Sequence, residues 1–363
     1  ECMSILLFFA VLFVLILVHE WGHFMVAKKT GMRVDEFGIG FPPRLFGWQK
    51  GETEYTFNAL PIGGFVKIWG ENAEDAGTDE DRTRAFGARP KWAQALVLIA
   101  GVTMNILFAW FLYVIVFMVG VPTIVSETEA TDAAQLYIST VLPESPAAAA
   151  RLPVGAEIVA LSAGSDTIDE LYPSTVSTFI AEHETVAIRY TLGQEEEVVT
   201  LSPVTGLLED EPDRPVIGVA FALAETQSQP FFTALMTATK TTTETLVAVA
   251  VGLATLLHDS VLGEADFSQV AGPVGIVGMV GDAAQFGITS LLLFTAVISL
   301  NLAVINLLPF PALDGGRLLF VAIESVTRRS INPVWVARLN FVGFALLMLL
   351  MVAVTYNDIL RLV

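Results

Sequence analysis

Four long apolar stretches constrain this chain more than any other feature of its sequence. They cover residues 3–27, 92–121, 289–308 and 336–356. A helix needs about 20 apolar residues to cross the hydrocarbon core of a bilayer, and each stretch reaches or nearly reaches that length. Charged residues make up 16% of the chain, compared with about 25% in ordinary soluble domains. The sequence therefore predicts an α-helical polytopic membrane protein with about four transmembrane helices.

Two apolar segments need a separate interpretation. Residues 246–257 form a fifth stretch of only 12 residues after a polar run. We interpret it as a helix lying at the membrane interface, within a linker region over residues 211–288. The first stretch contains His19 and Glu20, with no basic segment before it and no small-residue cleavage site after it. We therefore expect it to be a membrane span and not a secretory signal.

The charges are segregated along the chain. Ten Lys and Arg residues lie in 27–91 and four more between Arg317 and Arg338, which places both segments in the cytoplasm by the positive-inside rule. Residues 122–230 hold 18 acidic and three basic residues, leaving −15 of the net −19 in one segment that we expect outside. Both termini are then extracytoplasmic. A nucleic-acid partner would need clustered basic residues, so the expected partner is the lipid bilayer and not nucleic acid.

Two segments outside the apolar stretches have strand patterns. Residues 186–190 and 197–201 alternate apolar and polar side chains, and Ser145-Pro146 is typical of a helix start, so we expect a small α+β domain over 122–210. Residues 31–70 contain short strand-like runs divided by Gly and Pro, which predict a small β-sheet at the membrane. The acidic start of the following segment, 71–91, predicts a mobile loop.

The first apolar stretch carries the strongest chemical signal, His19-Glu20-Trp21-Gly22-His23. Positions four apart share one face of a helix, so both imidazoles reach one metal ion and Glu20 stands beside it as a base. At a rise of about 1.5 Å per residue, His19 lies about 24 Å beyond Met3, inside the bilayer. Ionisable residues at that depth mark functional sites. The pattern predicts a zinc site within a membrane helix.

A catalytic zinc site usually has three protein ligands. Cysteine is excluded as a ligand type for this site, since Cys2 is the single cysteine. His183 belongs to the outside domain and His258 to the interfacial helix, and we interpret both as surface residues. Asp314 is the better candidate, because it follows the third apolar stretch at its cytoplasmic end and two glycines follow it. Irregular backbone at membrane depth is tolerated where it lines a site.

These motifs together resemble those of the site-2 proteases, the intramembrane zinc metalloproteases, and specifically the bacterial regulator-of-sigma-E type. The resemblance rests on the motif from His19 to His23 and on the segment from Asn306 to Gly316. Further similar segments are Ile62–Lys67, Ala100-Gly101 with Asn105, and Gly272–Ile276. The resemblance covers most of the chain outside the acidic segment.

The resemblance implies one Zn²⁺ ion bound by His19, His23 and Asp314, with Glu20 as the catalytic base. It also implies substrate-binding residues, namely Asn306, Pro309, Pro311, Gly63, Gly64 and Phe65. It places a first catalytic half in residues 1–121, a PDZ-like domain in 122–210 and a second catalytic half in 289–363. The family's usual Gly-Leu-x-Pro-Gly-Asp is replaced by residues 151–156, Arg-Leu-Pro-Val-Gly-Ala. Peptide binding and steric gating therefore both remain open for this domain.

The implied function is cleavage of the transmembrane segments of single-span proteins that another protease has already trimmed. Anti-sigma factors and remnant signal peptides are the implied substrates, and the bacterial cytoplasmic (inner) membrane is the implied location, with the active site toward the cytoplasm. A catalytically silent membrane scaffold with a PDZ-like domain is the alternative. A membrane-tethered protease for soluble peptides is a third possibility, but the apolar run before His19 argues against it.

Overall fold

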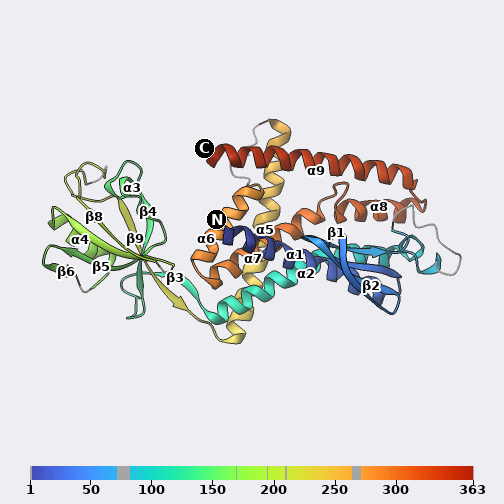
Figure 1. Ribbon diagram of the computed structural model, residues 1–363, viewed down its shortest axis with the longest axis horizontal. Helices are drawn as coiled ribbons and strands as arrows, with labels where there is room; N and C mark the ends of the chain where they lie inside the picture. The colour runs from blue at the N-terminus through green and yellow to red at the C-terminus, as the bar shows by residue number, and fades with distance from the viewer. Residues whose placement is uncertain are drawn as a thin grey trace. The chain divides into compact units, whose positions relative to one another are not determined.

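The computed structural model describes residues 2–71, 82–168, 170–193, 195–208, 211–263 and 271–362. The chain divides into two compact units (Figure 1). One consists of residues 1–114, 235–282 and 292–363, and the other of residues 115–234 and 283–291. The first unit contains most of the helical residues, and the second is built on a β-sheet.

Long apolar helices form most of the first unit. The bounds of the helices are α1 Cys2–Lys29, α2 Lys91–Val119, α5 Phe231–Leu262, α6 Pro273–Gln285, α7 Ile288–Leu307, α8 Asp314–Thr327 and α9 Pro333–Leu362. Among the described residues, α1, α2, α5, α7 and α9 are long and apolar enough to cross a membrane. The four apolar stretches of the sequence correspond to α1, α2, α7 and α9. These helices indicate a polytopic membrane protein.

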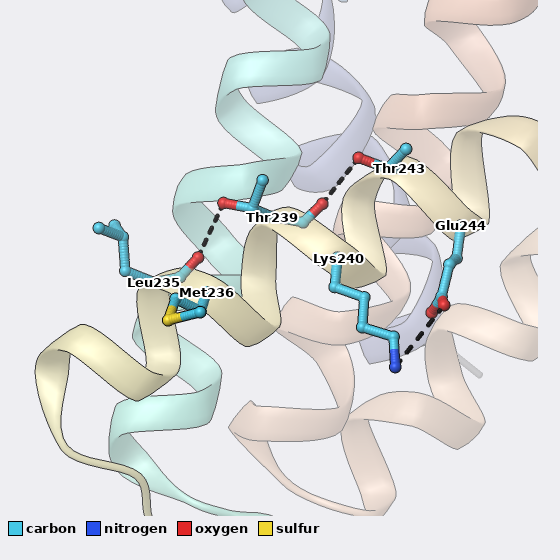
Figure 2. A pocket seen from close by; sticks show the side chains of 6 residues that line it. All are labelled: Leu235, Met236, Thr239, Lys240, Thr243 and Glu244. Atoms are coloured by element: carbon cyan, nitrogen blue, oxygen red, sulfur yellow. Dashed lines mark hydrogen bonds and ion pairs between the residues drawn. The ribbon is translucent and has the colours of Figure 1, made fainter.

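Helix α5 is longer than the sequence predicts, with 32 residues in place of 12. Its threonines explain the difference. The hydroxyls of Thr239 and Thr243 donate to the carbonyls of Leu235 and Thr239, both at 2.8 Å (Figure 2). Lys240 and Glu244 form an ion pair at 3.9 Å one turn apart. These four polar side chains bond within the helix, so the polar run does not end it. Figure 1 shows α5 running crosswise to α1 and α9.

A buried carboxylate joins α9 to the start of α6. Asp358, near the end of α9, is 4% exposed. Its two oxygens accept hydrogen bonds from the backbone N–H groups of Gly272 at 3.1 Å and Gly275 at 2.9 Å. The N-terminus of a helix has unpaired N–H groups and favours a negative charge. Asp358 therefore satisfies the first turn of α6 and fixes the end of α9 against it.

A two-stranded antiparallel sheet occupies the region 31–70, where the sequence predicts one. Its strands are β1 Val34–Lys50 and β2 Thr53–Ile68. Both strands bend so strongly that residues 36–39 of β1 pair with residues 54–57 of β2 on one side and with residues 64–67 on the other. The last part of β2 is thus an edge of the sheet. No strand in the described part of the chain pairs with its other side.

The turn between β1 and β2 is tied to the end of α1. Glu52 in this turn accepts hydrogen bonds from Lys28 at 2.8 Å and from Arg84 at 2.7 Å. The hydrogen bonds from Arg84, and then those from Lys28, lower the pKa of Glu52 to about 2, against the opposing effect of burial. The link therefore stays ionised at neutral pH.

The sequence predicts a loop over 71–91 between the sheet and α2, with residues 71–84 as its mobile part. Residues 72–81 of it lie outside the described residues. The part that follows forms two short 3₁₀ turns, Arg82–Arg84 and Phe86–Ala88, before α2 begins.

The second unit is a seven-stranded antiparallel sheet with two short helices. The strand order is β3-β9-β4-β5-β7-β8, with β6 beside β5. The bounds are β3 Val121–Val125, β4 Gln135–Val141, β5 Glu157–Ala163, β6 Asp166–Ile168, β7 Val186–Leu192, β8 Glu195–Leu201, β9 Val219–Gln227, α3 Pro146–Ala149 and α4 Pro173–Glu182. Strands β7 and β8 and helix α3 lie where the sequence predicts them. Strand β9 lies beyond residue 210 in the chain but between β3 and β4 in the sheet.

The chain enters and leaves this sheet at one point. Gly120 alone separates α2 from β3, and Val121 pairs with Gln227 at the end of β9. The backbone N–H of Gln229 donates to the carbonyl of Phe117 at 2.8 Å. We call residues 117–121 and 227–229 the neck. Its two segments are hydrogen-bonded neighbours, so the chain enters and leaves residues 121–227 at adjacent points.

Candidate active site

Helix α1 places His19 and His23 on one face, as the spacing predicts. Their Nε2 atoms are 3.1 Å apart. The two residues are 9% and 8% exposed, so both imidazoles are buried. Glu20 follows His19 directly in the helix. The motif therefore presents two imidazoles to one point, with a carboxylate on the neighbouring face.

Asp314 begins α8 and reaches the same point from the other half of the chain. Its Oδ2 atom lies 3.0 Å from His19 Nε2 and 3.2 Å from His23 Nε2. The two glycines after it make this approach possible. A Cβ on Gly315 would collide with the carbonyls of Leu307 and Leu308, and a Cβ on Gly316 with that of Phe310. Larger residues would push the start of α8, and with it the carboxylate, away from the segment 307–310.

The three groups have the geometry of a zinc site. Tetrahedral zinc with bonds of about 2.0–2.1 Å holds its ligand atoms about 3.3 Å apart. The three separations here are 3.0, 3.1 and 3.2 Å. Two imidazole nitrogens and one carboxylate oxygen are also a common donor set of catalytic zinc. In the described part of the chain, this is the group of metal-ligating side chains close enough to hold one ion.

The charge of Asp314 suits a metal ligand. Burial alone would raise the pKa of Asp314, but its hydrogen bonds with His19 and His23 outweigh burial and hold the pKa well below its ordinary value. A ligand carboxylate must be ionised to bind a metal. The arrangement therefore keeps Asp314 in the form that binds.

Helix α2 supports both histidines through one stripe of residues four apart, Val97, Gly101 and Asn105. Nδ1–H of His23 donates to the Val97 carbonyl at 2.8 Å, and the Asn105 amide lies 3.3 Å from Nδ1 of His19. Gly101 lies under the two rings. A Cβ there would collide with Nε2 of His23 and lie 2.7 Å from Cε1 of His19. The stripe fixes how each ring faces the site.

A cavity of about 360 Å³ opens beside this cluster. Its lining residues are Glu20, His23, Phe65, Val66, Lys67, Ile68, Glu71, Val97, Leu98, Asp314 and Arg317. The last part of β2 thus forms one wall of the cavity. A Cβ on Gly64 of the same strand would lie 3.8 Å from Cγ of Glu20. Arg317 and Glu71 form an ion pair at this cavity. The cavity brings the Glu20 carboxylate and a strand edge to the metal-ligating cluster.

The other residues singled out by the sequence lie outside this cavity wall. Asn306 lies in the last turn of α7, and Pro309 and Pro311 lie between α7 and α8. The ring of His183 donates to the Phe179 carbonyl at 2.8 Å, and His258 is beside Asp259. A larger hollow of about 580 Å³ lies along α5, lined by Leu235, Met236, Thr239, Lys240, Thr243 and Glu244 (Figure 2). It holds one acid and no histidine, so it lacks the donor set of the cluster.

The sequence profile of peptidase family M50 matches residues 7–350. The chain belongs to peptidase family M50. Among its relatives, the zinc metalloprotease RasP of Oceanobacillus iheyensis is 29% identical over 96% of this chain and 97% of its own. The regulator of sigma-W protease RasP of Bacillus subtilis is 28% identical over 99% of both chains. A Clostridium perfringens protein named for zinc metalloprotease activity is 36% identical over 95% of both.

Membership of M50, the site-2 protease family, confirms the resemblance seen in the motifs. The protein is an intramembrane protease and its cofactor is zinc. The sequence did not assign roles to Val97, Gly101, Asn105, Arg317 or Glu71. Gly101 and Asn105 were visible as part of the resemblance, and their spacing of four places them on one face of α2. Nothing in the sequence aligns that face with α1.

Proposed function

We propose that this M50 protease binds zinc through His19, His23 and Asp314, uses Glu20 as its base, and cleaves transmembrane segments of single-span proteins after another protease has trimmed them. Anti-sigma-factor-like proteins and remnant signal peptides are the proposed substrates. The observation that carries this proposal is the meeting of two ligands from α1 and one from α8 at a cavity that Glu20 lines. The name of the Bacillus subtilis relative, a regulator of sigma-W protease, favours regulatory substrates.

The proposed chemistry divides between the metal and the protein. Zinc held by three protein ligands polarises a peptide carbonyl and makes water acidic. Glu20 lines the same cavity, so its carboxylate takes the proton of the attacking water and passes it to the leaving amine. His23 is held in one orientation by the Val97 carbonyl. Asp314 supplies negative charge to the ligand set.

The edge of β2 is the proposed binding surface for the unwound substrate. A transmembrane helix has its carbonyls hydrogen-bonded, so it must open before cleavage. Phe65 and Val66 pair with β1 on one side and line the cavity beside Glu20. An extended segment that adds to this edge would lie along the cavity, held by main-chain hydrogen bonds. Asn306, Pro309 and Pro311 remain proposed substrate-binding residues from the family resemblance.

We propose a topology in which α1, α2, α7 and α9 span the membrane and the second unit is extracytoplasmic. The basic residues of 27–91 favour a cytoplasmic location for the β1–β2 sheet, and the −15 charge of 122–230 favours the outside. Helix α5 is long enough to be a fifth span. Its crosswise direction relative to α1 and α9 supports the interfacial position instead (Figure 1). Both termini are then extracytoplasmic.

The substrate class is tested by comparing cells that produce the wild-type protein with cells that produce Glu20→Gln. Small membrane peptides that lack an extracytoplasmic domain should accumulate only with the variant, as shown by quantitative proteomics of membranes. Zinc content of both purified proteins is measured in parallel. Equal peptide populations in the two strains would contradict the proposed function. A wild-type protein without zinc would favour the silent scaffold.

We further propose that the second unit, a PDZ-like domain, acts as a size gate. Peptide capture by strand addition needs a free strand edge. Strand β9, which contacts α4, is paired with β4 on one side, and β3 covers residues 223–227 on the other. Glu127, just after β3, accepts hydrogen bonds from the backbone N–H and the hydroxyl of Ser174 on α4. The chain's own residues thus occupy part of the edge that a peptide would use.

The neck allows a clean test of the gate. Residues 121–227 are excised and the ends joined by a short Gly-Ser linker, since Phe117 and Gln229 are hydrogen-bonded neighbours. The excised variant should cleave a single-span substrate that still carries a folded extracytoplasmic domain, which the wild type spares. Both proteins should cleave the trimmed substrate, which serves as the control. If the excised variant also spares the untrimmed substrate, the domain is not a gate.

A further inference from the structure

Asn105 lies against the metal-ligating cluster in an arrangement that leaves one polar atom without a partner. The residue is fully buried, and its backbone carbonyl accepts a hydrogen bond from the hydroxyl of Ser299 on α7 at 2.8 Å. Its side-chain Nδ2 lies 3.3 Å from Nδ1 of His19. Its Oδ1 is buried and has no hydrogen-bond partner in the described part of the chain. A buried amide oxygen of this kind costs free energy in this state, and it is available as an acceptor in another.

The hydrogen bonds of the two histidines show which ring protons a metal-bound state requires. Nδ1–H of His23 donates to the Val97 carbonyl, which leaves Nε2 of His23 as the atom that can bind a metal. His19 also points Nε2 into the cluster, 3.0 Å from Asp314 Oδ2. When Nε2 of His19 binds a metal, its ring proton must sit on Nδ1. Nδ1–H then needs an acceptor, and the amide NH₂ group that faces it is a donor.

We propose that Asn105 is a positioning residue that serves His19 in two states by rotation of its amide. Without metal, Nε2–H of His19 donates to Asp314, and Nδ1 accepts from Nδ2 of Asn105. With zinc on Nε2, the Asn105 amide is flipped so that Oδ1 and Nδ2 exchange positions. Oδ1 then accepts from Nδ1–H of His19. The two orientations have the same shape, so the buried site need not change. This inference rests on the proposed ligand set.

The Asn105 amide differs from a side chain that only fills space. In the metal-bound state its acceptor atom, Oδ1, is needed and its donor group is not. Outer hydrogen bonds to ligating histidines fix the ring and raise its basicity, and losing one typically costs about 10- to 100-fold in metal affinity. An aspartate at this position keeps the acceptor and lacks the donor. A leucine has similar volume and keeps neither. The two substitutions therefore separate hydrogen bonding from packing.

Zinc affinity is measured on the purified full-length protein by competition with a chelator, together with thermal melting of the metal-free form. Asn105→Leu should bind zinc about 10- to 100-fold more weakly. Asn105→Asp should bind at least as tightly as the wild type, and its metal-free form should melt at a lower temperature. Asn301→Leu is the matched control, because the Asn301 amide donates to Val297 of its own helix α7. It should leave zinc affinity unchanged.

Each outcome identifies what has failed. Wild-type zinc affinity in Asn105→Leu, or equal losses in Asn105→Leu and Asn105→Asp, would overturn the role of Asn105. Asp314→Asn and His23→Ala are measured in the same series. If these two keep zinc, the proposed ligand set is wrong. If they lose zinc while Asn105→Leu keeps it, the ligand set stands and the positioning role falls.

Discussion

Glu20→Gln should reduce cleavage by about 10²- to 10⁴-fold, the range that a positioned acid–base group contributes, while the protein keeps its zinc. Glutamine has nearly the shape of glutamate but cannot accept a proton. Glu20 is absent from the group of three side chains whose ligand atoms converge, although it lines the same cavity. Its removal should therefore change the chemistry and leave the ligands in place. Turnover of a trimmed single-span substrate and zinc content of the same preparation measure the two effects.

The control for this substitution is Glu244→Gln on α5. Glu244 is also an acid on a long apolar helix, and it forms an ion pair with Lys240 at 3.9 Å. It does not line the cavity beside the metal-ligating cluster. It should retain both cleavage and zinc. Full cleavage by Glu20→Gln would remove Glu20 from the reaction. Loss of zinc together with cleavage would assign Glu20 to holding the metal site and not to proton transfer.

Gly101→Ala should weaken zinc binding and abolish cleavage, because one methyl group enters the space of the two ligand rings. The new Cβ would collide with Nε2 of His23 and lie 2.7 Å from Cε1 of His19. Helices α1 and α2 pack closely at this level. A Cβ on Gly22 of α1 would already lie 2.5 Å from the Ala100 carbonyl of α2, so the two backbones are in close contact. Zinc content and thermal melting of the purified variant measure the effect.

Gly252→Ala separates this steric effect from the general effect of replacing a helical glycine. Gly252 lies in α5 with open space around the position of a Cβ. Alanine in a helix is favoured over glycine by about 0.5–1 kcal/mol, so this variant should be as stable as the wild type or more so. Its zinc content should be unchanged. Normal zinc binding by Gly101→Ala would mean that α1 and α2 approach each other less closely than described.

The sequence predicted the long helices well where apolarity alone decides them. The helices α1, α2, α7 and α9 contain the predicted stretches almost entirely, since long apolar runs have few other structures available. It underestimated the length of α5, because the hydroxyls of Thr239 and Thr243 bond within the helix and hide their polarity. It also predicted short strands in 31–70, where two long strands fold back on each other. The bending of these strands depends on how β1 and β2 pair, and local sequence patterns do not predict that pairing.

For the candidate site, sequence reasoning reached the three side chains that lie together and missed those that pack against them. His19, His23 and Asp314 were chosen from residue type, spacing and membrane depth, and the structure brings all three together. Gly101 and Asn105 act across the contact between α1 and α2. Their roles depend on the register of one helix against another. Helical periodicity gives the face of each helix but not its height relative to the neighbour.

The neck has a consequence for how proteases of this architecture diversify. An insertion whose two ends are hydrogen-bonded neighbours closes its own loop, so the cost of attaching it depends little on its length. A larger, duplicated or unrelated module placed between residues 120 and 228 would keep the same two attachment points. Under the proposed size gate, selection can therefore change which proteins are admitted without touching the metal-ligating cluster. Exchanging whole modules at this junction is also a practical route to proteases with new client proteins.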